Sequence, residues 1–150
     1  MLKEIEIMRF AGIVSGVAGA LALTGLHQVF KNISVSAPRV DILGMRTIVK
    51  ILKRFGFSIP KAKKLYLTSL AGDILFNSIY YSLTSTGKRP LLSGSALGIG
   101  AGAGVVNLPG RLGLGKGFSA SSGKQKLMSY AIYLTGGIVS AISYKLLKNI

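Results

Sequence analysis

The chain of 150 residues contains no cysteine, no tryptophan, one histidine and only four acidic residues. Without cysteine there is no disulfide framework, no thiolate metal site and no cysteine nucleophile. A single histidine is too few for two axial haem ligands, and scattered acids do not supply a zinc or di-iron site. We therefore expect no bound metal and no cofactor.

Charged residues are also scarce, and they are unevenly placed. They make up 15% of the chain, whereas soluble proteins carry about 25%. Hydrophobic residues make up 49%, and the mean hydropathy is +0.52. Long stretches carry no charge, while the lysines and arginines collect between them, as they do in membrane proteins. This pattern predicts an all-α membrane protein that forms a single domain over residues 1–150.

Four apolar blocks are long enough to be transmembrane helices. At about 1.5 Å per residue, roughly 20 residues cross a hydrocarbon core about 30 Å thick. The predicted spans are residues 10–30, 65–83, 91–108 and 127–147. The first block could instead be a secretory signal, because Val35, Ser36 and Ala37 resemble a cleavage site. Its length, with Glu4 and Glu6 before it, favours a retained helix.

Between the first two blocks, residues 41–55 have the pattern of an amphipathic helix. Apolar residues recur at helical spacing from Ile42 to Leu52, and basic residues occupy the other faces. Asp41 is placed to cap the first amides. We expect a basic helix in the membrane interface, with its charges toward anionic head groups. A short helix that packs on the bundle, with its charges in water, is the alternative.

The basic segments between the blocks predict contacts with anionic phospholipids. The residues expected at lipid head groups are Arg46, Lys50, Lys53, Arg54, Arg111 and Lys116. Residues 110–116 also have the spacing GxxxxGK of a phosphate-binding loop. Gly117 stands where that motif needs serine or threonine, and no buried strand precedes it, so we expect a flexible basic loop. Aromatic residues are not interleaved with the basic ones, which argues against specific nucleic-acid binding.

Asp73 is the only acid deep in a hydrophobic block, and it carries the sharpest functional hypothesis. Asn77 follows one helical turn later on the same face. An ionised carboxylate in mid-membrane is costly, so it should face the bundle interior, a watery cavity or a cation, or be protonated. With His27 near the end of the first block, these residues form the predicted intramembrane polar site. The alternative is a structural role for Asp73 through hydrogen bonds.

The third block has glycine at intervals of four residues. Such stripes of small residues let helices approach closely in lipid. The predicted helix-packing residues form two stripes: Gly94, Gly98 and Gly102, and Gly100 and Gly104. A glycine-rich re-entrant loop that lines a pore is the alternative, because residues 107–109 end the block abruptly.

Positive charge predicts the orientation. The segments after the first and third blocks hold thirteen of the nineteen lysines and arginines, and the other side holds six. We therefore expect these segments in the cytoplasm, both termini outside, and a bacterial inner membrane as the location. Tyr80 and Tyr81 fit an aromatic belt at the opposite interface.

Two functions are compatible with this organisation. The expected function is a small non-catalytic accessory or structural subunit, which packs against anionic phospholipids and other membrane protein subunits or itself. The alternative is an oligomeric channel or carrier for a cation or proton that uses Asp73 and Asn77. We expect no enzyme, because the sequence has no GxSxG nucleophile motif and a single histidine.

Overall fold

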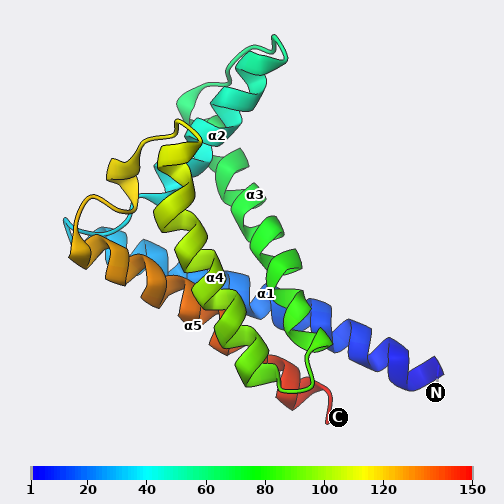
Figure 1. Cartoon of the computed structure of the whole chain (residues 1–150). Helices are drawn as coiled ribbons and strands as arrows, with labels where there is room; N and C mark the ends of the chain where they lie inside the picture. The colour runs from blue at the N-terminus through cyan, green and yellow to red at the C-terminus, as the bar shows by residue number, and fades with distance from the viewer. Residues whose placement is uncertain (1, 150) are drawn as a thin grey trace.

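The computed structural model describes the backbone of residues 2–149 and the side chains of residues 6–115 and 117–149. Over this range the chain is helical, without strands (Figure 1). The helices are α1 (Leu2–Ile33), α2 (Val40–Arg54), α3 (Ala62–Ser82), the short η1 (Leu83–Thr86), α4 (Pro90–Arg111), the short η2 (Lys116–Phe118) and α5 (Gly123–Leu147). The predicted all-α fold is confirmed.

Three segments are long and apolar enough to cross a membrane. They are Glu6–Ile33 within α1, and the helices α4 and α5. α3 occupies the predicted second span but is not among them, since it carries Asp73, Asn77, two lysines and several hydroxyl groups. The structure thus has three helices that could span a membrane, and the predicted count of four is not confirmed.

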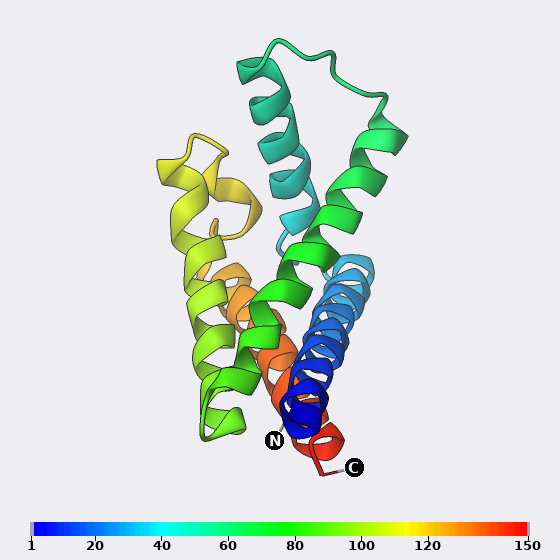
Figure 2. The same ribbon diagram turned by 90° about the vertical axis from the view of Figure 1, so that its right-hand side faces the viewer.

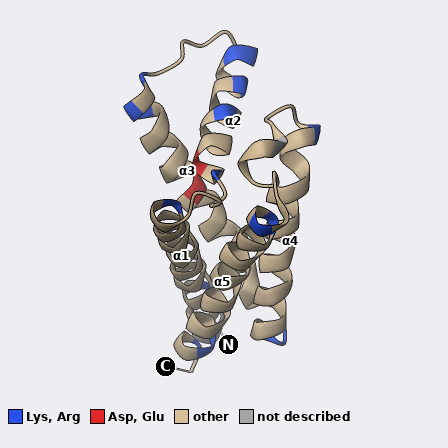
Figure 3. Cartoon of the chain, turned by 90° about the vertical axis from the view of Figure 1, so that its left-hand side faces the viewer, with Lys and Arg blue, Asp and Glu red and all other residues tan. Residues whose placement is uncertain are grey.

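The four long helices alternate in direction along the chain. Figures 1 and 2 show both termini at one end, with the connection from α3 to α4, and α2 and η2 at the other. α5 packs along α1 and α4, and α1 also packs along α3. Lysines and arginines lie toward the two ends, and most of them lie at the α2 end (Figure 3). Basic residues that are clustered between apolar blocks in the sequence are therefore also clustered at the ends of the bundle.

Glycines allow the close approach of α4 to α5. A Cβ atom added at Gly98 would lie 2.7 Å from Cα of Leu134, and one added at Gly102 would lie 2.8 Å from Cδ1 of Tyr130. Gly94 faces the backbone of α5 in the same way. One predicted stripe therefore lies at the helix contact, where any side chain would separate the two helices.

The second predicted stripe lies elsewhere. A Cβ at Gly104 would meet only the Leu108 side chain of its own helix, at 3.7 Å, and Gly100 is exposed beside Tyr80. Gly19 on α1, which belongs to neither predicted stripe, does make a close contact, since its added Cβ would lie 2.6 Å from the Gly136 carbonyl oxygen of α5. Spacing alone did not distinguish these glycines.

α4 continues through Pro109, where the sequence suggested an abrupt end. Proline has no N–H, so the Val105 carbonyl loses its usual helical donor. The Ser119 hydroxyl donates to that carbonyl at 2.6 Å, and the Ser129 hydroxyl donates to the Ser119 carbonyl at 3.1 Å. The glycine-rich block is thus one continuous helix, with no re-entrant turn in it. Hydrogen bonds hold the following loop, for which the sequence predicts flexibility.

Two local predictions were wrong. Asp41 does not cap α2, because its carboxylate accepts from Lys31 at 2.8 Å and from Arg39 at 3.1 Å. Tyr81 does not lie in an interfacial belt, because it is fully buried and its hydroxyl donates to the Tyr133 carbonyl at 2.7 Å. The two cations hold the Asp41 carboxylate away from the amides at the start of α2. The hydrogen bond to α5 holds Tyr81 in the core of the bundle.

Candidate functional site

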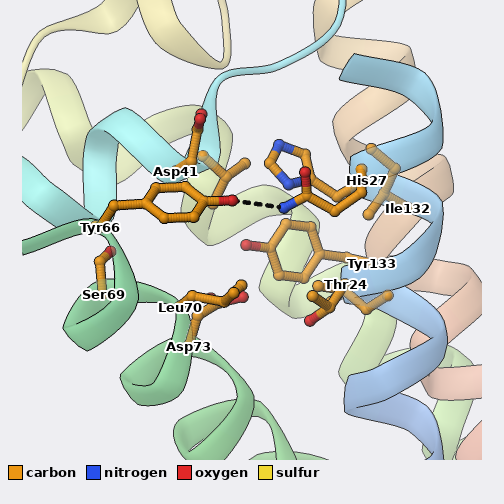
Figure 4. A pocket seen from close by; sticks show the side chains of 13 residues that line it. Thr24, His27, Asp41, Tyr66, Ser69, Leu70, Asp73, Ile132 and Tyr133 are labelled. Atoms are coloured by element: carbon orange, nitrogen blue, oxygen red, sulfur yellow. Dashed lines mark hydrogen bonds between the residues drawn. The ribbon is translucent and has the colours of Figure 1, made fainter. Parts of the chain in front are cut away.

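A polar cavity of about 70 Å³ lies where α1, α2, α3 and α5 meet (Figure 4). A water molecule needs about 10–15 Å³ by the same measure, so the cavity is large enough to hold water. The polar side chains that line it are Thr24, His27, Gln28, Asp41, Tyr66, Ser69, Asp73 and Tyr133. The structure therefore brings together His27 and Asp73, which lie on different helices and were both predicted site residues.

Asp73 lines the cavity from α3 (Figure 4). Its Oδ1 atom accepts a hydrogen bond from Asn77 Nδ2 at 2.9 Å, and the same amide donates to the Asp73 carbonyl at 2.8 Å. Asn77 does not line the cavity itself. It orients the carboxylate from one side, which leaves the second carboxylate oxygen for a ligand in the cavity.

His27 is buried, and its ring joins α1 to the segment before α2. Its Nε2 atom lies 2.9 Å from the Pro38 carbonyl oxygen. A carbonyl oxygen only accepts hydrogen bonds, so Nε2 carries the hydrogen that bonds to it. His27 thus holds this connection in place and lines the cavity.

Thr24 contributes a hydroxyl group that is free to bond to water or a ligand in the cavity. Its Oγ1 atom is buried and has no hydrogen-bond partner among the described residues. A buried hydroxyl without a partner costs about 1–3 kcal/mol, which a water molecule or a ligand in the cavity would recover. The hydroxyl group of Tyr133, from α5, lies at the same cavity (Figure 4).

Asp41 also lines the cavity, but its charge is already compensated. Burial alone would raise the pKa of Asp41, whereas hydrogen bonds from Arg39 and Lys31 outweigh burial and lower it to about 2. The carboxylate is therefore ionised and paired at neutral pH. The ion pairs among the described side chains belong to Asp41, so Asp73 has no cationic partner there.

Sequence reasoning missed Thr24, Tyr66 and Tyr133. Thr24 precedes His27 by three residues, and Tyr66 precedes Asp73 by seven, so each shares a helical face with a residue that was selected. That spacing was a usable signal for these two side chains. Tyr133 offered none, because nothing in the sequence says which face of α5 meets α1 and α3.

The side chains that line the cavity are suited to binding an ion with a single positive charge. Among the described residues, no group of three or more His, Asp or Glu side chains gathers as a metal site. The cavity instead combines one carboxylate without a cationic partner among the described side chains with the hydroxyl groups of Thr24, Tyr66, Ser69 and Tyr133. One negative charge balances a proton or a monovalent cation, and neutral oxygen atoms can replace part of a cation's hydration shell.

The predicted lipid contacts occupy several different positions. Arg46 donates to the Leu114 carbonyl at 2.9 Å, and Lys50 donates to another carbonyl of the same loop. Five of the predicted contacts have exposed side chains: Arg46, Lys50, Lys53, Arg54 and Arg111. The side chain of Lys116 lies outside the described residues. Two of the basic residues therefore also hold the loop between α4 and α5.

Comparisons with protein-family models, with curated proteins and with solved structures found no match for this chain. No relative therefore suggests a ligand or a partner. The cavity and the surface of the bundle are the features from which a function can be argued.

Proposed function

We propose that this chain is a membrane protein that binds a proton or a small monovalent cation in the polar cavity and carries it across the bilayer as an oligomer. The observation that carries this proposal is the meeting of Asp73, Thr24 and Tyr133 in one cavity. Asp73 has no cationic partner, and Thr24 Oγ1 has no hydrogen bond, among the described residues. Acids inside membrane segments are costly and mark ion or proton pathways.

In this proposal α3 is the fourth span, and its side chains Tyr66, Ser69 and Asp73 are tolerated because they line the cavity. α2 lies at the membrane surface, at the basic end of the bundle (Figure 3). The positive-inside rule places that end in the cytoplasm, on the inner side of a bacterial inner membrane, with both termini outside. The alternating directions of the long helices support this arrangement (Figure 2).

Binding is tested by thermal unfolding of the purified protein in mild detergent. At constant ionic strength, we replace choline chloride with lithium, sodium, potassium or ammonium chloride. A cation that binds the folded state should raise the melting temperature, since occupancy at 100 times Kd stabilises by about 2.7 kcal/mol. If the guest is a proton, the salts have no effect, and the pH dependence of melting differs between wild type and Asp73→Asn.

The matched control is Glu6→Gln, which removes the same charge from an exposed acid outside the cavity. We expect this variant to keep the wild-type response and Asp73→Asn to lose it. The proposed binding would be contradicted if no cation changed the melting temperature and if wild type and Asp73→Asn had the same pH dependence of melting.

A second candidate function, the non-catalytic accessory subunit, is favoured by an apolar groove of about 560 Å³ between α1 and α3. The apolar side chains that line this groove are Ile13, Val17, Ala71, Ile74, Leu75 and Ile79. A helix of a partner protein would bury this surface. The mass of the purified protein in mild detergent distinguishes the two functions. Co-purifying polypeptides would favour the accessory subunit, and a homo-oligomer would favour the carrier. A monomer of 15.8 kDa would contradict both.

A further inference from the structure

A second groove runs along α2, between this helix, the start of α3 and the loop after α4. Its volume is about 500 Å³. The buried residues Leu65 and Leu114 form its floor, and Ile42, Met45 and Val49 of α2 form an apolar wall. The groove is therefore large and apolar enough for part of a lipid chain, and it lies at the end of the bundle where the basic residues gather (Figure 3).

Three cations stand along the same groove: Arg46, Lys50 and Lys53. Arg46 and Lys50 each donate to one loop carbonyl, those of Leu114 and Leu112. A guanidinium has five N–H donors and an ammonium three, so both keep donors for another acceptor. No acidic residue lines the groove, and the ion pairs among the described side chains are made by Asp41.

We propose that this groove binds one anionic phospholipid. An acyl chain lies along the apolar wall of α2, and the phosphate lies among the three cations. Charge complementarity selects an anionic head group, because the cation of a zwitterionic head group would meet like charges there. The inference rests on the proposed position of α2 at the membrane surface, and it is independent of the cavity at Asp73.

The chain has no tryptophan, so a single introduced tryptophan reports on its own surroundings. Leu52→Trp places the indole on α2, three residues beyond Val49 and beside Lys53. Leu92→Trp places it on the exposed surface of α4, away from the groove. Each variant is reconstituted in vesicles in which phosphatidylglycerol or phosphatidylcholine carries brominated acyl chains, which quench nearby tryptophan fluorescence.

We expect the Leu52→Trp variant to be quenched preferentially by brominated phosphatidylglycerol, with a relative binding constant roughly fivefold or more above that for phosphatidylcholine. The Leu92→Trp variant should be quenched equally by both lipids, as any residue in contact with bulk lipid would be. Equal quenching of both variants by both lipids would overturn the proposed groove. Because the Leu92→Trp variant reports membrane insertion separately, that result would leave the cavity hypothesis intact.

Two substitutions that each remove one positive charge distinguish lipid binding in the groove from non-specific attraction of anionic lipids to the basic end of the bundle. Added to Leu52→Trp, Lys53→Gln should reduce the preference for phosphatidylglycerol by about fivefold. Lys63→Gln removes the same charge from an exposed residue at the same end that does not line the groove, and it should preserve the preference. Equal losses in both variants would show general electrostatics and overturn a specific site. Circular dichroism confirms that each variant keeps its helix content.

Discussion

The Gly98→Ala variant is expected to lower the free energy of unfolding by about 1–3 kcal/mol, because the new methyl group overpacks the contact between α4 and α5. An added Cβ would lie 2.7 Å from Cα of Leu134 and 2.8 Å from the Tyr133 carbonyl oxygen. Both atoms belong to the backbone of α5, so no side-chain rotation relieves the clash. For a chain of this size, the melting temperature in detergent should fall by roughly 3–10 °C.

Gly104→Ala is the matched control on the same helix. The added Cβ meets only the Leu108 side chain at an ordinary distance of 3.7 Å. Replacing a helical glycine with alanine is favourable by about 1 kcal/mol where space allows, so this variant should be as stable as wild type or more stable. Equal losses in the two variants would mean that α4 does not meet α5 along the Gly98 face.

Asp73→Asn is expected to abolish flux of the transported ion through the protein in liposomes. Asparagine keeps the size of aspartate and can still bond to Asn77, but it lacks the charge that compensates a cation in the cavity. The measurement is the rate at which an internal pH-sensitive dye or cation-sensitive dye responds to an imposed gradient. Wild-type protein should give a rate well above empty liposomes, and Asp73→Asn should give the rate of empty liposomes.

Two further variants make the flux result specific. Glu6→Gln should transport as wild type does, since its acid lies outside the cavity. Thr24→Val removes the unsatisfied hydroxyl with little change of volume, so transport should slow while the fold gains stability. Wild-type protein that shows the Asp73-dependent cation or pH response but no flux would refute transport and leave binding in place. Flux that persists in Asp73→Asn would refute the pathway itself.

Local sequence patterns predicted the helices well. Apolar blocks and charge clusters located α1, α4 and α5, and the alternation of apolar and basic residues located α2 to within one residue of Val40–Arg54. The predicted end of the third block at Pro109 was wrong, although proline usually stops a helix. The chain tolerates it because Ser119, which lies ten residues further along, supplies the donor that proline lacks.

The sequence by itself determined the helical class, the apolar segments and the residues that share a face within one helix, such as Asp73 and Asn77. These features follow from the 3.6-residue period and from the cost of burying charge. Only the tertiary structure decided which faces meet. Gly98 touches α5 and Gly104 does not, and Thr24, Asp73 and Tyr133 share a cavity although they come from three helices. The helical period carries no information about the rotation of one helix against another, which packing across the whole bundle sets.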